Sequence, residues 1–440
     1  MARADWYRLD NVGKFYASQA GRGGQTVFRF SATMNDAIDP KALQAALIRL
    51  VERFPGFNVK LRNGIFWHYL EPSGEIPAVQ PEAVPVCTGL HTGLDSVLFR
   101  VNYFRDRINL EVSHMISDGR GTLEFFRALL AAYVERRYGV PANLPEDPVP
   151  LSRRTEDSYT ANFEREKAGS SETPKVYHLS GWKNTAEPTF MEYHLPAGEV
   201  HQRAKAMGVS VTMLMIAAVI VAIRNTMPPS KRDRAIRMDV PVDLRDMFES
   251  ETLRNFFGLA FVSYTPGKVD ESLETIAHKV QEQLTGGTDP EALKRRMNSM
   301  LKIEKNPLIR AAPLFLKDGG LMIGNWMAAQ EVTTTVSSIG RIRLDDTTEP
   351  FVREINISTS TRGLNFLFCT FKDVLSMSIS SAYITHDVVR AFVGVFTELG
   401  VHGTMSVNKS AEQVDEDLRQ ARFEHASKQI AAARRKGSSR

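Results

Sequence analysis

A stretch rich in proline, serine and charged residues, positions 140–188, separates two halves of the chain that each contain helical and strand-like segments. Such a stretch has too few apolar side chains to form a core, which is typical of a long surface connection. We therefore predict an N-terminal lobe at 1–150, a connection at 151–188 and a C-terminal lobe at 189–410. A polar tail follows at 411–440.

The N-terminal half begins with a strong helical pattern at 39–54. Asp39 is a candidate N-cap, Pro40 stands at the first helical position, and leucines recur at helical spacing. Two stretches rich in β-branched and aromatic residues follow at 57–70 and 95–114, each broken by a short polar turn. This pattern predicts two hairpins, which we expect to belong to one antiparallel sheet.

The C-terminal half contains an apolar run at 213–223 that is too short to span a bilayer. We predict a buried helix there, capped by Ser210 or Thr212, and therefore no membrane span. Strand-like runs follow at 235–242 and 257–264, and a strand-rich block extends from 332 to 381 before a final amphipathic helix. Each half thus combines a mostly antiparallel sheet with flanking helices, so we predict an α+β fold of two two-layer sandwich lobes.

A methionine-rich segment at 297–330 has two interpretations. We favour core packing, and the alternative is that the segment lines a large apolar acceptor channel.

The charge balance and the cysteines exclude several classes of protein. The net charge of +4 is a small excess of 55 basic over 51 acidic residues spread along the chain, so no basic stripe indicates nucleic-acid binding. Cys87 and Cys369 lie far apart in apolar contexts, which favours reduced core thiols over a disulfide or a cysteine metal site. With no apolar signal core at the N-terminus, we expect a cytoplasmic protein.

The most informative short segment is EVSHMISDGRGTLEFF, residues 111–126. If the strand alternates, His114 lies on the same face as Ile108, Leu110 and Val112, and Asp118 is placed to cap the helix that follows. Three roles are then open for His114: a catalytic base, a metal ligand or a core histidine. A metal is disfavoured because the strand-to-helix break keeps His114 and Asp118 from facing one ion. A neutral imidazole at this position could take a proton at neutral pH.

Five segments in order along the chain carry a resemblance to a known family. SHMISDG resembles the HxxxDG motif of the CoA-dependent acyltransferase superfamily, which includes chloramphenicol acetyltransferases, condensation domains of peptide synthetases and alcohol acetyltransferases. Residues 53–71 and 208–223 resemble its N-terminal helix-to-hairpin segment and the helix that opens its second lobe. Residues 240–258 resemble its PV(N/D)LR…NxxG block, and residues 337–344 resemble its SN(I/L)G block.

The resemblance implies two chloramphenicol-acetyltransferase-like lobes with an active-site tunnel between them. His114 would be the general base, and Asp118 with Gly119 would hold the motif loop. Arg245 is the expected ion-pair partner of Asp118, because a buried carboxylate needs a paired cation. The resemblance also places further residues in the tunnel or near a developing oxyanion: Ser337, Ser338, Gly340, Asn255 and Gly258.

The activity implied is transfer of an acetyl or other short acyl group from acyl-CoA, as co-substrate, to a small-molecule alcohol. We expect no metal, no permanently bound cofactor and a monomer. An alternative is a stand-alone condensation-type enzyme that takes its acyl group from an acyl-carrier protein and forms an amide or an ester. A third reading is an inactive binding module, against which the intact motif argues. Condensation domains often carry a second histidine where this chain has Ser113, so a role of that position in peptide synthesis is not implied here. The lack of the DFGWG block of plant enzymes favours alcohol acetyltransferase-like and stand-alone condensation-like relatives.

Overall fold

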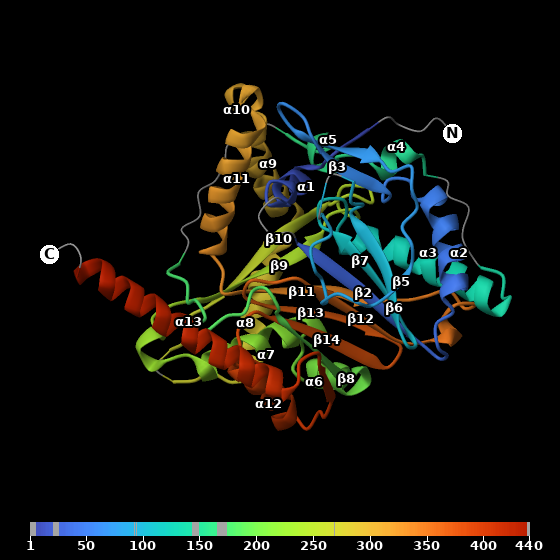
Figure 1. The fold of residues 1–440 in the computed structure, drawn as a ribbon. Coiled ribbons are helices and arrows are strands. Elements are labelled where there is room, and N and C mark those ends of the chain that lie inside the picture. The colour runs from blue at the N-terminus through green and yellow to red at the C-terminus, as the bar shows by residue number, and fades with distance from the viewer. Residues whose placement is uncertain are drawn as a thin grey trace.

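The strands form three sheets in the computed structural model, which describes residues 6–20, 26–91, 93, 95–142, 149–164, 174–267 and 269–437 (Figure 1). The first is a small sheet in the order β1-β4-β3. The N-terminal lobe is built on a five-stranded sheet in the order β12-β2-β7-β6-β5, and the C-terminal lobe on a seven-stranded sheet in the order β10-β9-β11-β13-β14-β8-β15. The strands run Tyr7–Arg8 (β1), Val27–Met34 (β2), Val59–Asn63 (β3), His68–Pro72 (β4), Gln80–Pro81 (β5), Phe99–Phe104 (β6), Arg107–Ser113 (β7), Thr189–Pro196 (β8), Ile236–Asp243 (β9), Phe257–Tyr264 (β10), Thr334–Arg341 (β11), Val352–Thr359 (β12), Leu364–Phe371 (β13), Val374–Ser381 (β14) and Thr404–Val407 (β15).

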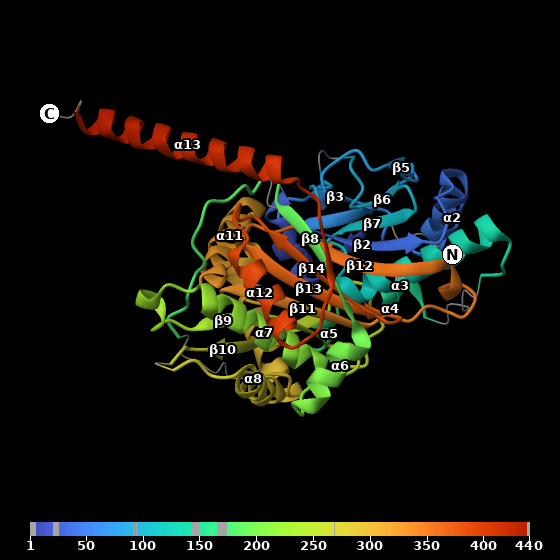
Figure 2. The same ribbon diagram turned by 90° about the horizontal axis from the view of Figure 1, so that it is seen from below.

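Helices pack on both large sheets, and further helices lie beyond them. They run Asn11–Ala17 (α1), Pro40–Arg53 (α2), Gly119–Tyr138 (α3), Leu151–Arg154 (α4), Ser158–Ala161 (α5), Ala197–Ala206 (α6), Val211–Thr226 (α7), Leu273–Gly287 (α8), Pro290–Glu304 (α9), Pro307–Ala311 (α10), Leu314–Ala329 (α11), Asp387–Glu398 (α12) and Ala411–Gly437 (α13), with short 3₁₀ turns at Pro229–Lys231 and Glu349–Phe351. The last of them, α13, projects away from the body of the molecule (Figure 2).

Each lobe has its own hydrophobic core. In the first lobe the apolar residues of α2 and α3 pack on one another and on the sheet. In the second lobe α7 is buried along most of its length, with Ser210 as its N-cap, and packs between α8 and α12. All pairings in the seven-stranded sheet are antiparallel except those of β11 with β9 and β13. The predicted α+β fold of two lobes is confirmed.

Within the described residues, no single helix is long and apolar enough to cross a membrane. The pair α6 and α7, bent by 86° at its break, passes that test of length and composition only when the two helices are taken together.

The prediction that the two N-terminal hairpins belong to one sheet is wrong. The hairpin of β3 and β4 pairs with β1, whereas the hairpin of β6 and β7 lies in the five-stranded sheet. An alternating pattern identifies a strand and the face it buries, but it does not select the sheet that the strand joins.

The predicted C-terminal lobe at 189–410 includes one strand, β12, that lies in the sheet of the first lobe. It pairs antiparallel with β2, with Ile355 opposite Ala32 and Ile357 opposite Phe30. The buried side chains of β12 accordingly belong to the first core. The boundary between the lobes in sequence therefore differs from their boundary in space. The C-terminal half of the chain supplies an edge strand to the sheet of the first lobe. The predicted connection at 151–188 contains α4 and α5, and its residues 165–173 lie outside the described part of the chain.

The preference for core packing of the methionine-rich segment at 297–330 is also wrong for its second half. Met297 and Leu301 of α9 are buried, but α11 exposes most of its large apolar side chains. Composition alone does not reveal that these side chains stay exposed instead of packing in a core.

Candidate active site

A cavity of about 2880 Å³ is lined by residues of both lobes. His114 and Phe28 line it from the first lobe, Ser337 and Phe257 line it from the second, and α11 borders it from one side. The arrangement matches the tunnel between two lobes that the family resemblance implies.

His114 follows directly after β7 and faces this cavity. Its backbone N–H donates to Thr26 O at 3.0 Å, and its half-buried ring lies between two aromatic side chains. The Tyr16 ring stacks on the imidazole with centroids 4.7 Å apart, and the Phe28 ring is tilted against it at the same centroid distance. Burial lowers the pKa of His114 below its ordinary value of 6.5, so the imidazole is neutral at neutral pH.

Asn255 fixes which nitrogen of His114 carries the proton. Its amide nitrogen donates to His114 O at 2.9 Å and to the Asp10 carboxylate at 3.1 Å, so its Oδ1 is the atom left to face His114 Nδ1, at 3.1 Å. An amide oxygen only accepts, so Nδ1 must be the protonated nitrogen. Nε2 then carries the free lone pair and is the basic atom of the ring.

The Asp10 carboxylate accepts hydrogen bonds from the backbone and the side chain of Asn255. The carboxylate is fully buried, caps α1 by accepting from Gly13 N at 2.6 Å, and accepts from Asn255 N at 3.2 Å. Burial raises the pKa of Asp10 to about 7, while the N–H groups of Gly13 and Asn255 favour its charged form. A chain of contacts therefore runs from the N-terminal segment through Asn255 to His114.

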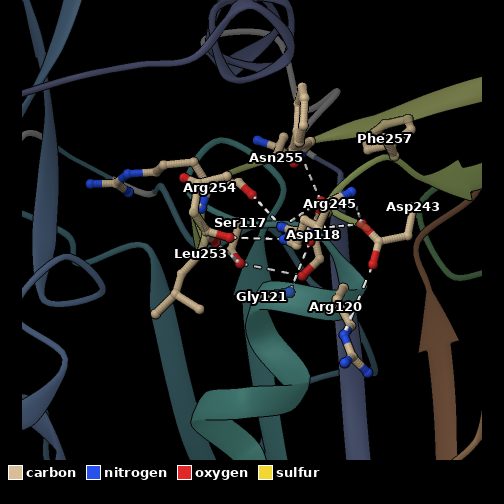
Figure 3. Close-up of polar contacts among 12 residues, drawn as sticks. Ser117, Asp118, Arg120, Gly121, Asp243, Arg245, Leu253, Arg254, Asn255 and Phe257 are labelled. Carbon is tan, nitrogen blue, oxygen red and sulfur yellow. Dashed lines mark hydrogen bonds and ion pairs between the residues drawn. The ribbon is translucent and has the colours of Figure 1, made fainter. Parts of the chain in front are cut away.

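Asp118 is both the N-cap of α3 and one half of a buried ion pair. Its Oδ1 accepts from Gly121 N at 2.9 Å, and its Oδ2 accepts from Phe256 N at 2.8 Å. Arg245 Nη2 donates to both oxygens, at 2.9 and 3.0 Å (Figure 3). The Asp118 carboxylate is thus directed at Arg245, and the ion pair that the resemblance implies is present in the structure.

Arg245 uses its remaining donors to tie the loop after β9 to the segment before β10. Its Nε donates to Thr252 O at 2.8 Å, its Nη2 also donates to Arg254 O at 2.7 Å, and its Nη1 contacts Asp243 Oδ1 at 2.8 Å (Figure 3). These contacts position the chain segment that carries Asn255 against the motif loop.

The motif loop also touches this segment directly. Ser117 Oγ donates to Leu253 O at 2.6 Å (Figure 3). A Cβ atom added at Gly121 would lie 2.3 Å from the same carbonyl oxygen, so only glycine fits there. A Cβ at Gly119 would lie 2.8 Å from Ile339 Cδ1, a side-chain atom that can move.

The tunnel candidates from the second lobe fall into two groups. Ser337, Ser338 and Gly258 line the cavity, and the last of these packs closely against Leu293. Gly340 does not line it; this residue sits at a β-bulge with φ of 76° and donates to Ser338 Oγ at 3.3 Å. Gly340 therefore shapes the strand end, and Ser337 and Ser338 are the serines of this strand that border the cavity.

Sequence reasoning missed three residues of the site: Asp10, Tyr16 and Gly121. The first two lie on or beside α1, about a hundred residues before the motif, and no local pattern links them to it. The second glycine in DGRG is a weak signal of a close backbone approach.

The chain was compared with protein-family models, with curated protein sequences and with solved structures. Residues 196–379 match the family model described as phthiocerol/phthiodiolone dimycocerosyl transferase C-terminus. No curated protein sequence matches the chain.

Several solved structures share the fold across nearly the whole chain. TRI101 of F. graminearum, complexed with coenzyme A and deoxynivalenol, aligns with a TM-score of 0.64 at 13% identity, over 91% of this chain and 100% of that one. The first condensation domain of the CDA synthetase aligns with a TM-score of 0.60 at 16% identity, over 90% and 96%. Polyketide synthase associated protein 5 from Mycobacterium tuberculosis aligns with a TM-score of 0.59 at 12% identity, over 90% and 98%.

The fold is therefore shown: the chain has the two-lobed architecture of TRI101, of a peptide synthetase condensation domain and of polyketide synthase associated protein 5. Within that architecture, residues 196–379, from the end of β8 into β14, are the part of the chain that matches the family model.

Proposed function

We propose that the protein transfers an acyl group from acyl-CoA to an alcohol, with His114 as the general base. The observation that carries this proposal is the contact of Asn255 Oδ1 with His114 Nδ1, because it leaves Nε2 unprotonated in a ring that faces the cavity. The lowered pKa of His114 keeps Nε2 available at neutral pH. A positioned base of this kind contributes about 10²- to 10⁴-fold in rate.

In the proposed reaction, Nε2 takes the proton of the acceptor hydroxyl as its oxygen attacks the thioester carbonyl carbon. The tetrahedral intermediate then collapses, the C–S bond breaks, and Nε2–H returns its proton to the sulfur. The products are an ester and free CoA, and His114 ends neutral. The hydroxyl groups of Ser337 and Ser338 are the candidates to stabilise the oxyanion from the second lobe.

Asp118 and Arg245 have a positioning role in this proposal. Both oxygens of Asp118 are occupied by Arg245, Gly121 and Phe256, so this carboxylate is not part of a proton relay. TRI101, which shares the fold, has been crystallised with coenzyme A, and this supports a CoA thioester as the donor here.

The donor and the acceptor can be identified in one experiment. Purified protein is incubated with labelled acetyl-CoA and longer acyl-CoA thioesters, each with a panel of alcohols and amines, and product is detected by mass spectrometry. The proposal predicts ester formation from at least one CoA thioester. Turnover with an acyl-carrier thioester alone would instead support a condensation-type enzyme, and binding of ligands without turnover of any donor would support an inactive binding module.

A further inference from the structure

Helix α11 turns its polar side toward the protein and its apolar side toward solvent, the reverse of an ordinary surface helix. Its polar side chains face the protein: Lys317 Nζ donates to Phe66 O at 2.8 Å, Asp318 contacts His68 Nε2 at 3.1 Å, and Asn325 Nδ2 donates to Gln19 Oε1 at 3.2 Å. A surface helix normally buries its apolar stripe and exposes its polar one.

The opposite side of α11 presents large apolar side chains to solvent. Phe315 is 71% exposed, Ile323 is 63% exposed and Trp326 is 66% exposed, and Leu316 and Met327 are exposed beside them. Their positions, 315, 316, 323, 326 and 327, follow helical spacing and therefore lie on one face.

Neighbouring segments extend this surface. The turn between β3 and β4 contacts the start of α11, where Leu314 N donates to Ile65 O at 3.0 Å. We call the whole set the outer apolar face; its members are Ile65, Phe66, Trp67, Leu308, Phe315, Leu316, Ile323, Trp326 and Met327. Figure 1 shows α10 and α11 standing at the edge of the molecule, so the outer apolar face lies at its periphery.

The charged residues of the segment that carries α10 and α11 are mainly positive. Residues 305–330 contain Lys305, Arg310 and Lys317, and the one acidic residue among them, Asp318, already contacts His68. Two of the apolar side chains are tryptophans, which favour the boundary between hydrocarbon and water.

From this geometry we propose that the outer apolar face docks on the surface of a lipid bilayer that contains anionic headgroups. The apolar side chains would enter the boundary between headgroups and acyl chains, and Lys305 and Arg310 would contact the phosphates. With 16 residues α11 lies along the surface and does not cross it.

The position of the cavity favours a bilayer, and not a second copy of the chain, as the partner of the outer apolar face. Leu321 and Gly324 of α11 line the large cavity, and so do four members of the outer apolar face, Phe66, Trp67, Leu308 and Leu316, so this face adjoins the cavity along α11. An apolar molecule could then pass between the bilayer and the cavity along α11 with little exposure to water. A dimer through this face would leave the surrounding positive charges opposed to one another.

The test is co-sedimentation of the full chain with vesicles of phosphatidylcholine, either alone or mixed with phosphatidylglycerol. We expect the parent protein to bind the mixed vesicles. The triple variant Phe315→Ser, Ile323→Ser, Trp326→Ser should bind them at least about 100-fold more weakly. Phe423→Ser is the matched control, since Phe423 on α13 is 73% exposed but far from the outer apolar face in the sequence. This control should bind like the parent protein.

A second measurement avoids dependence on the folding of the triple variant. The fluorescence of the parent protein should shift to shorter wavelength on addition of mixed vesicles, and Trp326→Phe should lose much of that shift. The proposal is overturned if the parent protein stays unbound with both vesicle types, or if the triple variant binds like the parent. It is also overturned if the outer apolar face instead forms a dimer that the triple variant dissociates without any vesicle binding. None of these readouts requires turnover, so they are independent of the proposed acyl transfer.

Discussion

The side-chain oxygen of Asn255 lies 3.1 Å from Nδ1 of His114, while the nitrogen of the same amide donates to the backbone oxygen of His114 at 2.9 Å. One side chain from the second lobe thus clamps both the ring and the backbone of a histidine from the first lobe. The clamp selects the Nε2 lone pair as the base and couples its position to the contact between the lobes.

The pH dependence of acyl transfer should show the state of His114. The base must be unprotonated to act, and burial lowers its pKa below 6.5. We therefore expect kcat/KM to be flat from neutral pH down to about 6.5 and to fall only below it. Initial rates across a pH series in constant ionic strength measure this, and an acid limb centred above pH 7 would contradict the assignment.

Asn255→Ala should change both the height and the position of that profile. The hydrogen bond from Nδ1–H to Oδ1 stabilises the charged imidazole, so its loss should lower the pKa of His114 further and move the acid limb to lower pH. The plateau of kcat/KM should fall about 10- to 100-fold, because the ring is no longer held in one tautomer and orientation. A profile identical to that of the parent protein would show that the amide contact is not used.

Asp118→Asn should destabilise the fold by about 3 kcal/mol, because it leaves the buried Arg245 cation without its main partner. The matched control is Asp243→Asn, which removes the other carboxylate on Arg245 from a site that is open to solvent and should cost less than about 1 kcal/mol. Denaturant midpoints measure both. Equal effects of the two substitutions would contradict a dominant role for the pair of Asp118 and Arg245.

Gly121→Ala should destabilise the protein by about 1 to 3 kcal/mol and lower activity, because the new methyl group would collide with the backbone oxygen of Leu253. Gly394→Ala is the control, since this glycine of α12 has open space around it and alanine favours the helix. Thermal unfolding compares the two. An unchanged midpoint for Gly121→Ala would show that the loop can move away at no cost.

The motif region is predictable from the sequence because its signals are local. Asp118 begins α3 as its cap, Gly119 is the first helical residue, and the apolar spacing after them fixes the buried side. A buried carboxylate needs a paired cation, so a partner for Asp118 could be expected. The choice of Arg245 among the many arginines came only from the resemblance of residues 240–258 to the PV(N/D)LR block of the family.

The remaining parts of the site depend on contacts that no local pattern encodes. Asp10 reaches Asn255 across 245 positions of sequence, and Tyr16 stacks on His114 from a helix of seven residues. In the sequence of β12, Ile355 and Ile357 alternate with polar residues, as in many strands, and nothing there indicates that β12 joins the first lobe. The outward orientation of α11 reverses the usual rule for surface helices, so pattern reasoning assigned its apolar residues to a core.

The most direct test of His114 as the base is the rate of labelled acyl transfer by His114→Ala, measured with the best donor and acceptor from the panel. The variant should keep the thermal midpoint of the parent protein within a few degrees. Its kcat/KM should fall by about 10²- to 10⁴-fold at neutral pH. A folded His114→Ala variant that transfers the acyl group at the parental rate would contradict the assignment.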